Sequence, residues 1–302
     1  MTEPDSPVGE RVGFLGLGIM GSRMAANVAD AGFPLSVWTH TPGKADRWAA
    51  EHGATARATP AAVASDSDIV ISMVVDGEQV ASVLVGDGGV LDGARPGLLC
   101  VDMSTIGPSD TRRIGAALAE REVRMLDAPV TGSSPRAESG TLTIMAGGAD
   151  QDFARALPVL ESMGELIVHV GELGQGEMLK LINNALGAAN AAALAEALLL
   201  ARATGVDLDA FVQVASKGSG GSAQLDLKSQ AMREHDFRTL FKTAHMLKDV
   251  RLCLEEAQQA GMPFPAASHA RDLLSATIGR GRADDDYSAL IEAAEGLAGR
   301  RL

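Results

Sequence analysis

One lysine, Lys180, stands near the start of a long Ala- and Leu-rich stretch that otherwise carries little charge. If a helix begins near Gly176, Asn184 lies one turn further along the same face, so an amine and an amide meet there. Burial disfavours the charged form of lysine and lowers its pKa from about 10.4, so such an amine can exchange a proton near neutral pH. The sequence therefore predicts a proton-transfer site at Lys180. A lysine that reaches the surface from a helix end is the alternative.

A second motif lies near the N-terminus, where a short apolar run leads into the pattern G-x-G-x-x-G and then into a predicted helix. The pattern consists of Gly16, Leu17, Gly18, Ile19, Met20 and Gly21. After a strand and before a helix, such a turn presents backbone amides and the helix N-terminus to a pyrophosphate. We therefore expect a dinucleotide site here, with a purely structural glycine turn as the alternative.

The residues after the second predicted strand indicate which dinucleotide binds. Proteins that prefer NAD usually carry an acidic residue about 20 positions past the first glycine, where it binds the ribose 2′-hydroxyl. This chain has none there, and instead carries Thr39, His40, Thr41 and Lys44. These side chains suit a 2′-phosphate, so the sequence favours NADP over NAD, with NAD still possible. A polar turn without a ligand is the alternative.

Two further segments carry side chains that could hold an anion. Thr131, Gly132 and Ser133 follow a predicted strand and can offer a hydroxyl and amides to a carboxylate, with Arg136 as a further contact or a solvated loop residue. An ordinary inter-strand loop is the alternative. Lys248 lies on a predicted helix and could reach a cofactor or substrate, or could form an ion pair on an amphipathic helix.

The order of apolar segments predicts an α/β fold with two domains. Up to about residue 170, short apolar runs alternate with amphipathic stretches, as in a doubly wound parallel sheet. Seven strands are expected, at 12–15, 35–38, 69–74, 98–101, 123–126, 142–145 and 166–170. Helices follow, expected at 175–204, 208–216, 222–233, 239–260, 266–279 and 286–299. We therefore expect a dinucleotide-binding domain over residues 1–170 and an all-helical domain over residues 171–302.

Composition excludes several classes of function. The chain has 302 residues and a net charge of −13, which opposes binding to nucleic acid or to an anionic membrane surface. Its two cysteines, Cys100 and Cys253, lie in separate apolar runs, which indicates buried thiols in a reducing compartment. The histidines show no metal-binding spacing, no run of membrane length is evident, and the polar segment 1–11 does not resemble a signal peptide. We expect a cytoplasmic protein without a metal.

Taken together, the motifs resemble the β-hydroxyacid dehydrogenase family, which includes 3-hydroxyisobutyrate dehydrogenase and the tartronate, glyoxylate and succinic semialdehyde reductases. The matching segments are GFLGLGIMG, DMST, DAPVTGS followed by GTLTIMAGG, GQGEMLKLINN and KDVRL. The resemblance implies a Rossmann domain, a helical domain that builds a homodimer or homotetramer, and an interdomain active site. It also implies that Lys180 is catalytic, that Asn184 aligns the substrate and that residues 131–133 hold its carboxylate. Thr105 and Lys248 would contact the nicotinamide end of the cofactor, and we add Met73 and Val74 to the cofactor-binding set.

Departures from the family pattern bear on the substrate. The usual Ser-Gly-Gly is Thr131-Gly132-Ser133 here, which keeps a hydroxyl and narrows the space around the carboxylate. The segment 134–137 resembles the tartronate semialdehyde reductases, and Asn183 replaces the histidine of 6-phosphogluconate dehydrogenases. Imine reductases share the architecture and generally lack the lysine. We therefore expect an oxidoreductase that interconverts a short β-hydroxyacid and its semialdehyde, with an imine reductase or a non-catalytic dinucleotide-binding module as alternatives.

Overall fold

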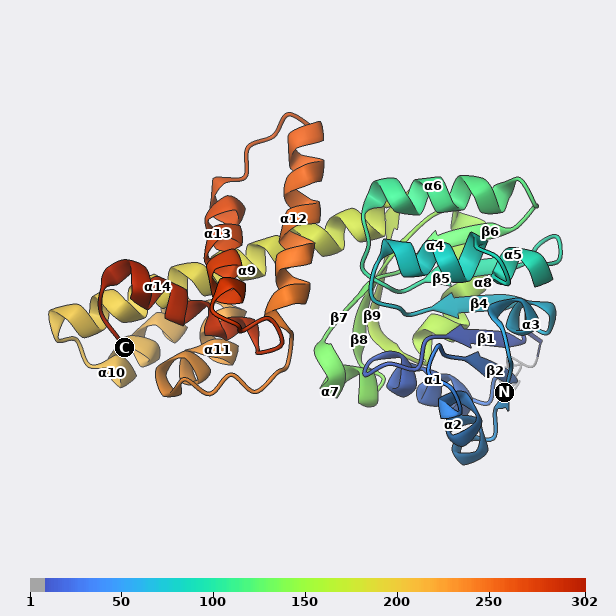
Figure 1. Cartoon of the computed structure of the whole chain (residues 1–302), viewed down its shortest axis with the longest axis horizontal. Coiled ribbons are helices and arrows are strands. Elements are labelled where there is room, and N and C mark those ends of the chain that lie inside the picture. Colours follow the sequence, from blue (N-terminus) through green and yellow to red (C-terminus); the bar gives the residue numbers. More distant parts are fainter. Residues whose placement is uncertain (1–8) are drawn as a thin grey trace, which may run out of the picture. The chain divides into compact units, whose positions relative to one another are not determined.

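The computed structural model describes residues 9–302 and divides into two compact units, one ending at Lys180 and one spanning Leu181–Leu302 (Figure 1). The polar segment 1–11, which the sequence predicts not to be a signal peptide, lies mostly outside the described residues. The division falls inside the helix that the sequence predicts at 175–204. The N-terminal turn of this helix is hydrogen-bonded to Asp127 in the first unit.

The first unit contains a sheet of nine strands within residues 9–302. The strands are β1 (Val12–Leu15), β2 (Leu35–Trp38), β3 (Thr55–Ala56), β4 (Ile69–Ser72), β5 (Leu99–Asp102), β6 (Arg124–Asp127), β7 (Val130–Thr131), β8 (Leu142–Gly147) and β9 (Gly164–Gly171). Strands β3-β2-β1-β4-β5-β6 are parallel in that order, and β8 joins β6 antiparallel. Strand β7 pairs antiparallel and β9 parallel with β8. The expected doubly wound sheet is confirmed.

Helices cover both faces of this sheet. They are α1 (Gly21–Asp30), α2 (Lys44–His52), α3 (Pro60–Ser65), α4 (Gly77–Val85), α5 (Val90–Gly93), α6 (Pro108–Ala119), α7 (Ser133–Glu138) and α8 (Asp150–Glu161). One core cluster joins the sheet to α1, α2 and α8, and the other joins it to α3, α4, α5 and α6. Strands buried on both faces explain the continuous apolar runs in the sequence.

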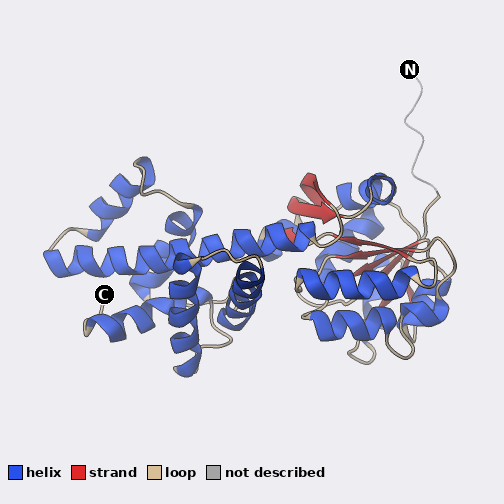
Figure 2. Ribbon diagram, turned by 90° about the horizontal axis from the view of Figure 1, so that it is seen from above, coloured by secondary structure: helices blue, strands red, loops and turns tan. Residues whose placement is uncertain are grey.

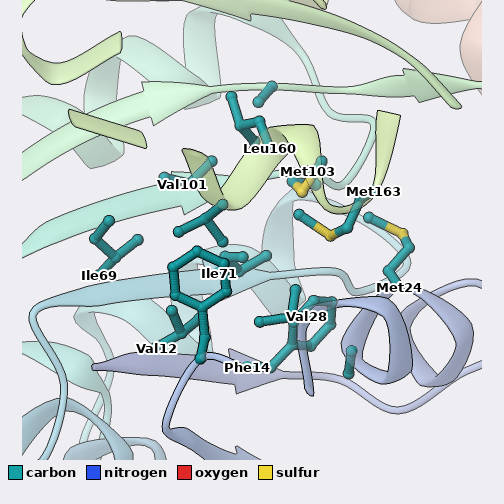
Figure 3. Packing of buried hydrophobic residues seen from close by; sticks show 14 of the residues in the cluster. Val12, Phe14, Met24, Val28, Ile69, Ile71, Val101, Met103, Leu160 and Met163 are labelled. Atoms are coloured by element: carbon teal, nitrogen blue, oxygen red, sulfur yellow. The ribbon is translucent and has the colours of Figure 1, made fainter. Parts of the chain in front are cut away.

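Successive residues of each central strand point to opposite faces of the sheet. Phe14 and Ile71 belong to the cluster under α1, where Figure 3 shows them beside Met24 and Val28. Leu15 belongs to the cluster on the other face. Strands β1 and β4 pair in parallel up to Leu15 and Ser72, so their carboxyl ends lie side by side. The loops that leave these ends carry the predicted cofactor residues.

The second unit is helical, as predicted, apart from an isolated bridge between Lys242 and Asp286 (Figure 2). Its elements are α9 (Gln175–Thr204), which begins in the first unit, α10 (Leu208–Lys217), α11 (Ala223–Glu234), α12 (Thr243–Gln259), α13 (Pro265–Gly279), the 3₁₀ turn η1 (Tyr287–Ala289) and α14 (Leu290–Ala298). Helix α12 starts at Thr243 and not at residue 239. The preceding amides of Leu240 and Phe241 donate to the carboxylate of Asp286, so they are engaged outside the helix.

Helix α9 is long and apolar enough to cross a membrane by length and composition alone, so the expectation that no run reaches membrane length is wrong on that measure. Half of its most apolar window is buried within the protein. The core helix of a soluble protein passes the same test, which makes this weak evidence for a membrane span.

Candidate active site

At the two ends of the glycine loop between β1 and α1, no residue larger than glycine fits. Gly16 adopts φ 102°, and a Cβ there would lie 2.3 Å from the carbonyl oxygen of Met73. A Cβ at Gly21 would lie 2.0 Å from the carbonyl oxygen of Gly16. Gly18 is exposed, and a Cβ there would meet nothing within 4 Å. The loop is therefore packed against Met73, which directly follows β4, and is open at Gly18.

The N-terminus of α1 is available to an anion. Within residues 9–302, no side chain caps this helix, and its first turn contains no acidic residue. Its backbone amides and its dipole therefore keep their affinity for a negative group, as a dinucleotide pyrophosphate requires. The residues present fit an NAD(P) cofactor at this loop.

The end of β2 lies against the glycine loop. The backbone N–H of Leu17 donates to the Thr39 hydroxyl at 3.4 Å, so Thr39 contacts the loop. His40 and Thr41 are exposed, and Lys44 begins α2 after Gly43, which adopts φ 68°. The structure thus brings Thr39 to the glycine loop and leaves His40 and Thr41 exposed to solvent.

A buried polar cluster fixes the loop that follows β4. The Asp102 carboxylate accepts hydrogen bonds from the hydroxyls of Ser72 at 2.8 Å and Ser104 at 2.7 Å. The Ser104 hydroxyl in turn accepts from the backbone N–H of Val74 at 3.0 Å. Val74 and Met73 therefore have a defined position beside Gly16, and Thr105 directly follows the same cluster. Sequence reasoning missed Ser72, although DMST contains Asp102 and Ser104.

The predicted carboxylate loop is more ordered than a plain connection, because Val130–Thr131 forms β7 and α7 begins at Ser133. Gly132 adopts φ 136°, and a Cβ there would lie 2.7 Å from the Cβ and Cδ of Arg136. The Arg136 stem thus packs over Gly132. Ser133 adopts φ 58°, in the left-handed region that favours glycine. A serine hydroxyl is therefore held here at a cost in backbone strain, as is common at ligand-binding loops.

Helix α7 also contacts α1, the helix that follows the glycine loop, and sequence reasoning missed this link. The Asn27 side-chain amide donates to the carbonyl oxygen of Ala137 at 2.7 Å. Arg23 donates to the carbonyl oxygen of Ile19 at 2.6 Å and forms a 3.4 Å ion pair with Glu138. The glycine loop and the predicted carboxylate loop therefore rest on two helices in direct contact.

Asp127, the last residue of β6, binds the N-terminus of α9. Its two carboxylate oxygens accept the backbone N–H groups of Gly174 and Glu177, each at 2.7 Å. Burial raises the pKa of Asp127 to about 6, while the two N–H donors act to lower it. Lys180 follows three residues after Glu177 and is 7% exposed. The lysine therefore lies in a turn of α9 whose start is fixed by a buried carboxylate.

Within the helical unit, Asp249 contacts two of the predicted site residues. The side-chain amide nitrogen of Asn184 donates to Asp249 Oδ2 at 2.7 Å, and Lys248 Nζ lies 3.1 Å from Asp249 Oδ1. Asn184 is 7% and Asp249 1% exposed. Because a carboxylate only accepts hydrogen bonds, Asp249 fixes which end of the Asn184 amide faces it. That Lys248 shares a nicotinamide site with Thr105 of the first unit remains a prediction.

Comparison with known proteins covers almost the whole chain. Residues 11–171 match the family described as the NAD binding domain of 6-phosphogluconate dehydrogenase. Residues 174–294 match the family described as NAD-binding of NADP-dependent 3-hydroxyisobutyrate dehydrogenase. The two matches meet between residues 171 and 174, just before α9 begins.

Individual relatives are similar over most or nearly all of their length. The 2-hydroxy-3-oxopropionate reductase of Escherichia coli K12 is 37% identical over 292 residues, which cover 97% of this chain and 99% of the relative. A chloroplastic glyoxylate/succinic semialdehyde reductase of Arabidopsis thaliana is 33% identical. The match covers 96% of this chain and 80% of the relative. The solved structure of Mycobacterium tuberculosis 3-hydroxyisobutyrate dehydrogenase with L-serine matches with a TM-score of 0.87 at 33% identity. The match covers 94% of this chain and 99% of that structure's chain. The chain therefore belongs to the β-hydroxyacid dehydrogenase family and is an NAD(P)-dependent oxidoreductase.

Proposed function

We propose that the protein reduces a short semialdehyde bearing a carboxylate, such as tartronate semialdehyde or a close analogue, to the β-hydroxyacid with NADPH, and catalyses the reverse oxidation. Residues 1–170 would bind the cofactor through the glycine loop, and residues 171–302 would supply substrate contacts and the oligomer interface. The protein would work in the cytoplasm, a location that cell fractionation can test.

The observation that carries the proposal is a buried lysine and a buried amide one turn apart on α9. Lys180 and Asn184 are each 7% exposed, and Asp249 orients the amide of Asn184. A lysine side chain is seldom buried to this degree in a soluble protein, and this one lies a single helical turn from a buried amide. Proton transfer at an oxygen substrate is the chemistry that this pair suits best.

The glycine loop, Gly16 to Gly21, would hold NADPH, which would supply the hydride for the carbonyl carbon. Lys180 Nζ donates a proton to the carbonyl oxygen as it gains charge, and the amine then regains a proton from solvent. The Asn184 amide, held by Asp249, keeps its carbonyl oxygen as an acceptor for the substrate hydroxyl. Thr131 and Ser133 hold the carboxylate, so the reacting carbon is kept in line for the transfer. In the oxidative direction, Lys180 accepts the proton from the hydroxyl.

The proposal predicts that a carboxylate on the substrate is required. Removing the carboxylate should cost most of kcat/KM, because each buried donor left unpaired costs about 1 to 3 kcal/mol. The test compares short semialdehydes with uncharged aldehydes and cyclic imines of similar size, using initial rates with NADPH. Thr131→Val keeps the shape of the side chain and removes the hydroxyl. This variant should reduce the difference in kcat/KM between the semialdehyde and the uncharged aldehyde.

Two outcomes of this panel would contradict the proposal. Equal turnover of uncharged aldehydes would mean that the loop 131–133 does not hold a carboxylate. Turnover of cyclic imines without turnover of semialdehydes would identify an imine reductase. Cofactor binding without turnover of any substrate would favour a non-catalytic dinucleotide-binding module.

NADPH is expected to bind about tenfold more tightly than NADH, since one charge-assisted hydrogen bond to the 2′-phosphate contributes about 1.5 kcal/mol or more. The segment 39–44 carries no acidic side chain to repel that phosphate. Fluorescence titration of both cofactors into the wild type and a His40→Ala, Lys44→Ala double variant measures the preference. Lys217→Ala, an exposed lysine at the end of α10, is the charge control. Equal affinities in the wild type would refute the preference.

We also propose that the protein forms a homodimer or homotetramer. Large apolar side chains on α9 remain exposed within the described chain, with Leu186 at 53% and Leu200 at 66%. Covering such a face requires a partner surface, and a second copy is the usual partner in soluble enzymes. Light scattering at micromolar concentration should give a mass of at least twice 31.2 kDa. A monomer would contradict this expectation.

A further inference from the structure

The carboxylate of Asp127 lies where two parts of the first unit meet. On the chain, Asp127 ends β6 and is followed after three residues by Thr131, the start of the predicted carboxylate loop. In space, it accepts the N–H groups of Gly174 and Glu177 at 2.7 Å each. One residue therefore connects the loop 131–133 to the turn of α9 that leads into Lys180.

The surroundings of Asp127 leave its carboxylate almost no freedom. The residue is fully buried. A Cβ at Gly147 would lie 2.6 Å from Asp127 Oδ1, and a Cβ at Gly176 would lie 2.8 Å from Asp127 Oδ2. Two glycines thus let the strand β8 and the helix α9 close around the carboxylate. Such close packing transmits a small shift at this point directly to the start of α9.

We propose that Asp127 is a positioning residue that sets the place of Lys180 relative to the carboxylate-binding loop. The inference rests on the proposed function, in which the loop holds one end of the substrate and Lys180 serves the other. The loop and Lys180 must have the correct relative position for proton transfer and hydride transfer to occur together. A misplacement of about 1 Å outside the reacting groups can lower a rate by about 100-fold.

The test is Asp127→Asn, which keeps the shape of the side chain but replaces one acceptor oxygen with an NH₂ group. That group would face a backbone N–H, so one of the two bonds is lost. We expect kcat for semialdehyde reduction to fall by about 10- to 100-fold. We expect much smaller changes in KM and in the dissociation constant for NADPH, because the loop 131–133 and the glycine loop are unaltered. The kinetic isotope effect with NADPH deuterated at the transferred position should rise, because the chemical step becomes slower.

A purely structural role predicts a different result, namely a lower melting temperature with an unchanged kcat and isotope effect for the folded protein. Thr59→Ala is the matched control, because it removes a side-chain cap of α3 in the same unit, where the Thr59 hydroxyl accepts the N–H of Ala62 at 3.1 Å. It should lower stability by about 1 kcal/mol and leave kcat unchanged.

Gly176→Ala provides a second route if Asp127→Asn does not fold. Its Cβ would lie 2.3 Å from the carbonyl oxygen of Met145, so the start of α9 must move while the carboxylate is retained. We expect the same loss of kcat. Folded variants with kcat within about threefold of an active wild type would overturn the inference alone. A wild type inactive on every semialdehyde would overturn the proposed function, and the inference with it.

Discussion

Replacement of Lys180 by methionine is expected to lower kcat by about 10²- to 10⁴-fold, the usual contribution of a positioned general acid or base. Methionine is unbranched, apolar and flexible, so it fills the space of the buried lysine stem in α9 with little loss of packing. The glycine loop is unchanged, and the dissociation constant for NADPH should stay close to that of the wild type. Steady-state rates and a cofactor titration measure the two quantities separately.

A second substitution separates proton transfer from charge at this position. Lys180→Arg keeps the positive charge, but the guanidinium does not release its proton near neutral pH. If Lys180 acts as an acid, Lys180→Arg should be nearly as slow as Lys180→Met. Lys217→Met changes an exposed lysine in the same way and should keep wild-type turnover. Normal turnover in Lys180→Met would disprove the assignment.

Replacement of Asp286 by alanine is expected to destabilise the helical unit by about 3 to 5 kcal/mol, the cost of removing one partner from a buried ion pair. Lys228 Nζ lies 2.8 and 2.9 Å from the two oxygens of Asp286, and both residues are less than 5% exposed. The same carboxylate accepts the backbone N–H groups of Leu240, Phe241 and Ser288. Alanine would leave a buried ammonium and three amides without their acceptor.

Urea denaturation followed by circular dichroism measures this loss, because residues 181–302 are mainly helical. Both tryptophans of the chain, Trp38 and Trp48, lie in the first unit, so their fluorescence reports on that unit separately. Asp284→Ala is the control, because the Lys242–Asp284 ion pair is exposed and should contribute less than about 1 kcal/mol. An unchanged circular dichroism midpoint for Asp286→Ala would contradict the prediction.

The pH dependence of the Asp286 contribution has a definite sign. Burial acts to raise the pKa of this carboxyl, but Lys228 and the backbone donors hold the pKa below its ordinary value. The contribution to stability is therefore complete above the pKa of the unfolded chain and is lost as the pH falls through the lower pKa of the folded state.

Much of the fold could be predicted from the sequence because its signals are local. The seven expected strands correspond to β1, β2, β4, β5, β6, β8 and β9, since each is a short apolar run bounded by polar or glycine residues. The strands β3 and β7 were missed because two residues are too few to form a pattern. The glycine loop was recognisable because its three glycines have a fixed spacing.

The contacts that orient the candidate site were not predictable, because they join residues far apart in the chain. Asp127 meets Gly174 and Glu177 across 47 and 50 positions, and Asn184 meets Asp249 across 65. No periodicity encodes such a pair. The sequence does show where these carboxylates stand. Asp127 directly follows a predicted strand, and Asp249 directly follows the predicted site residue Lys248. A carboxylate beside a predicted site is a reason to look for a distant hydrogen-bond donor.

The glycines around Asp127 bear on how this enzyme could acquire a new substrate. A side chain at Gly176 is blocked both by the carboxylate and, independently, by the carbonyl oxygen of Met145. A side chain at Gly147 meets the backbone of Glu172 as well as the carboxylate. A change at either glycine therefore has to displace backbone as well as the carboxylate, so the start of α9 should tolerate substitution poorly. Ser133, in the predicted carboxylate loop, is only partly buried, so the packing around its side chain restricts a change of side chain less, although its φ of 58° favours glycine or asparagine.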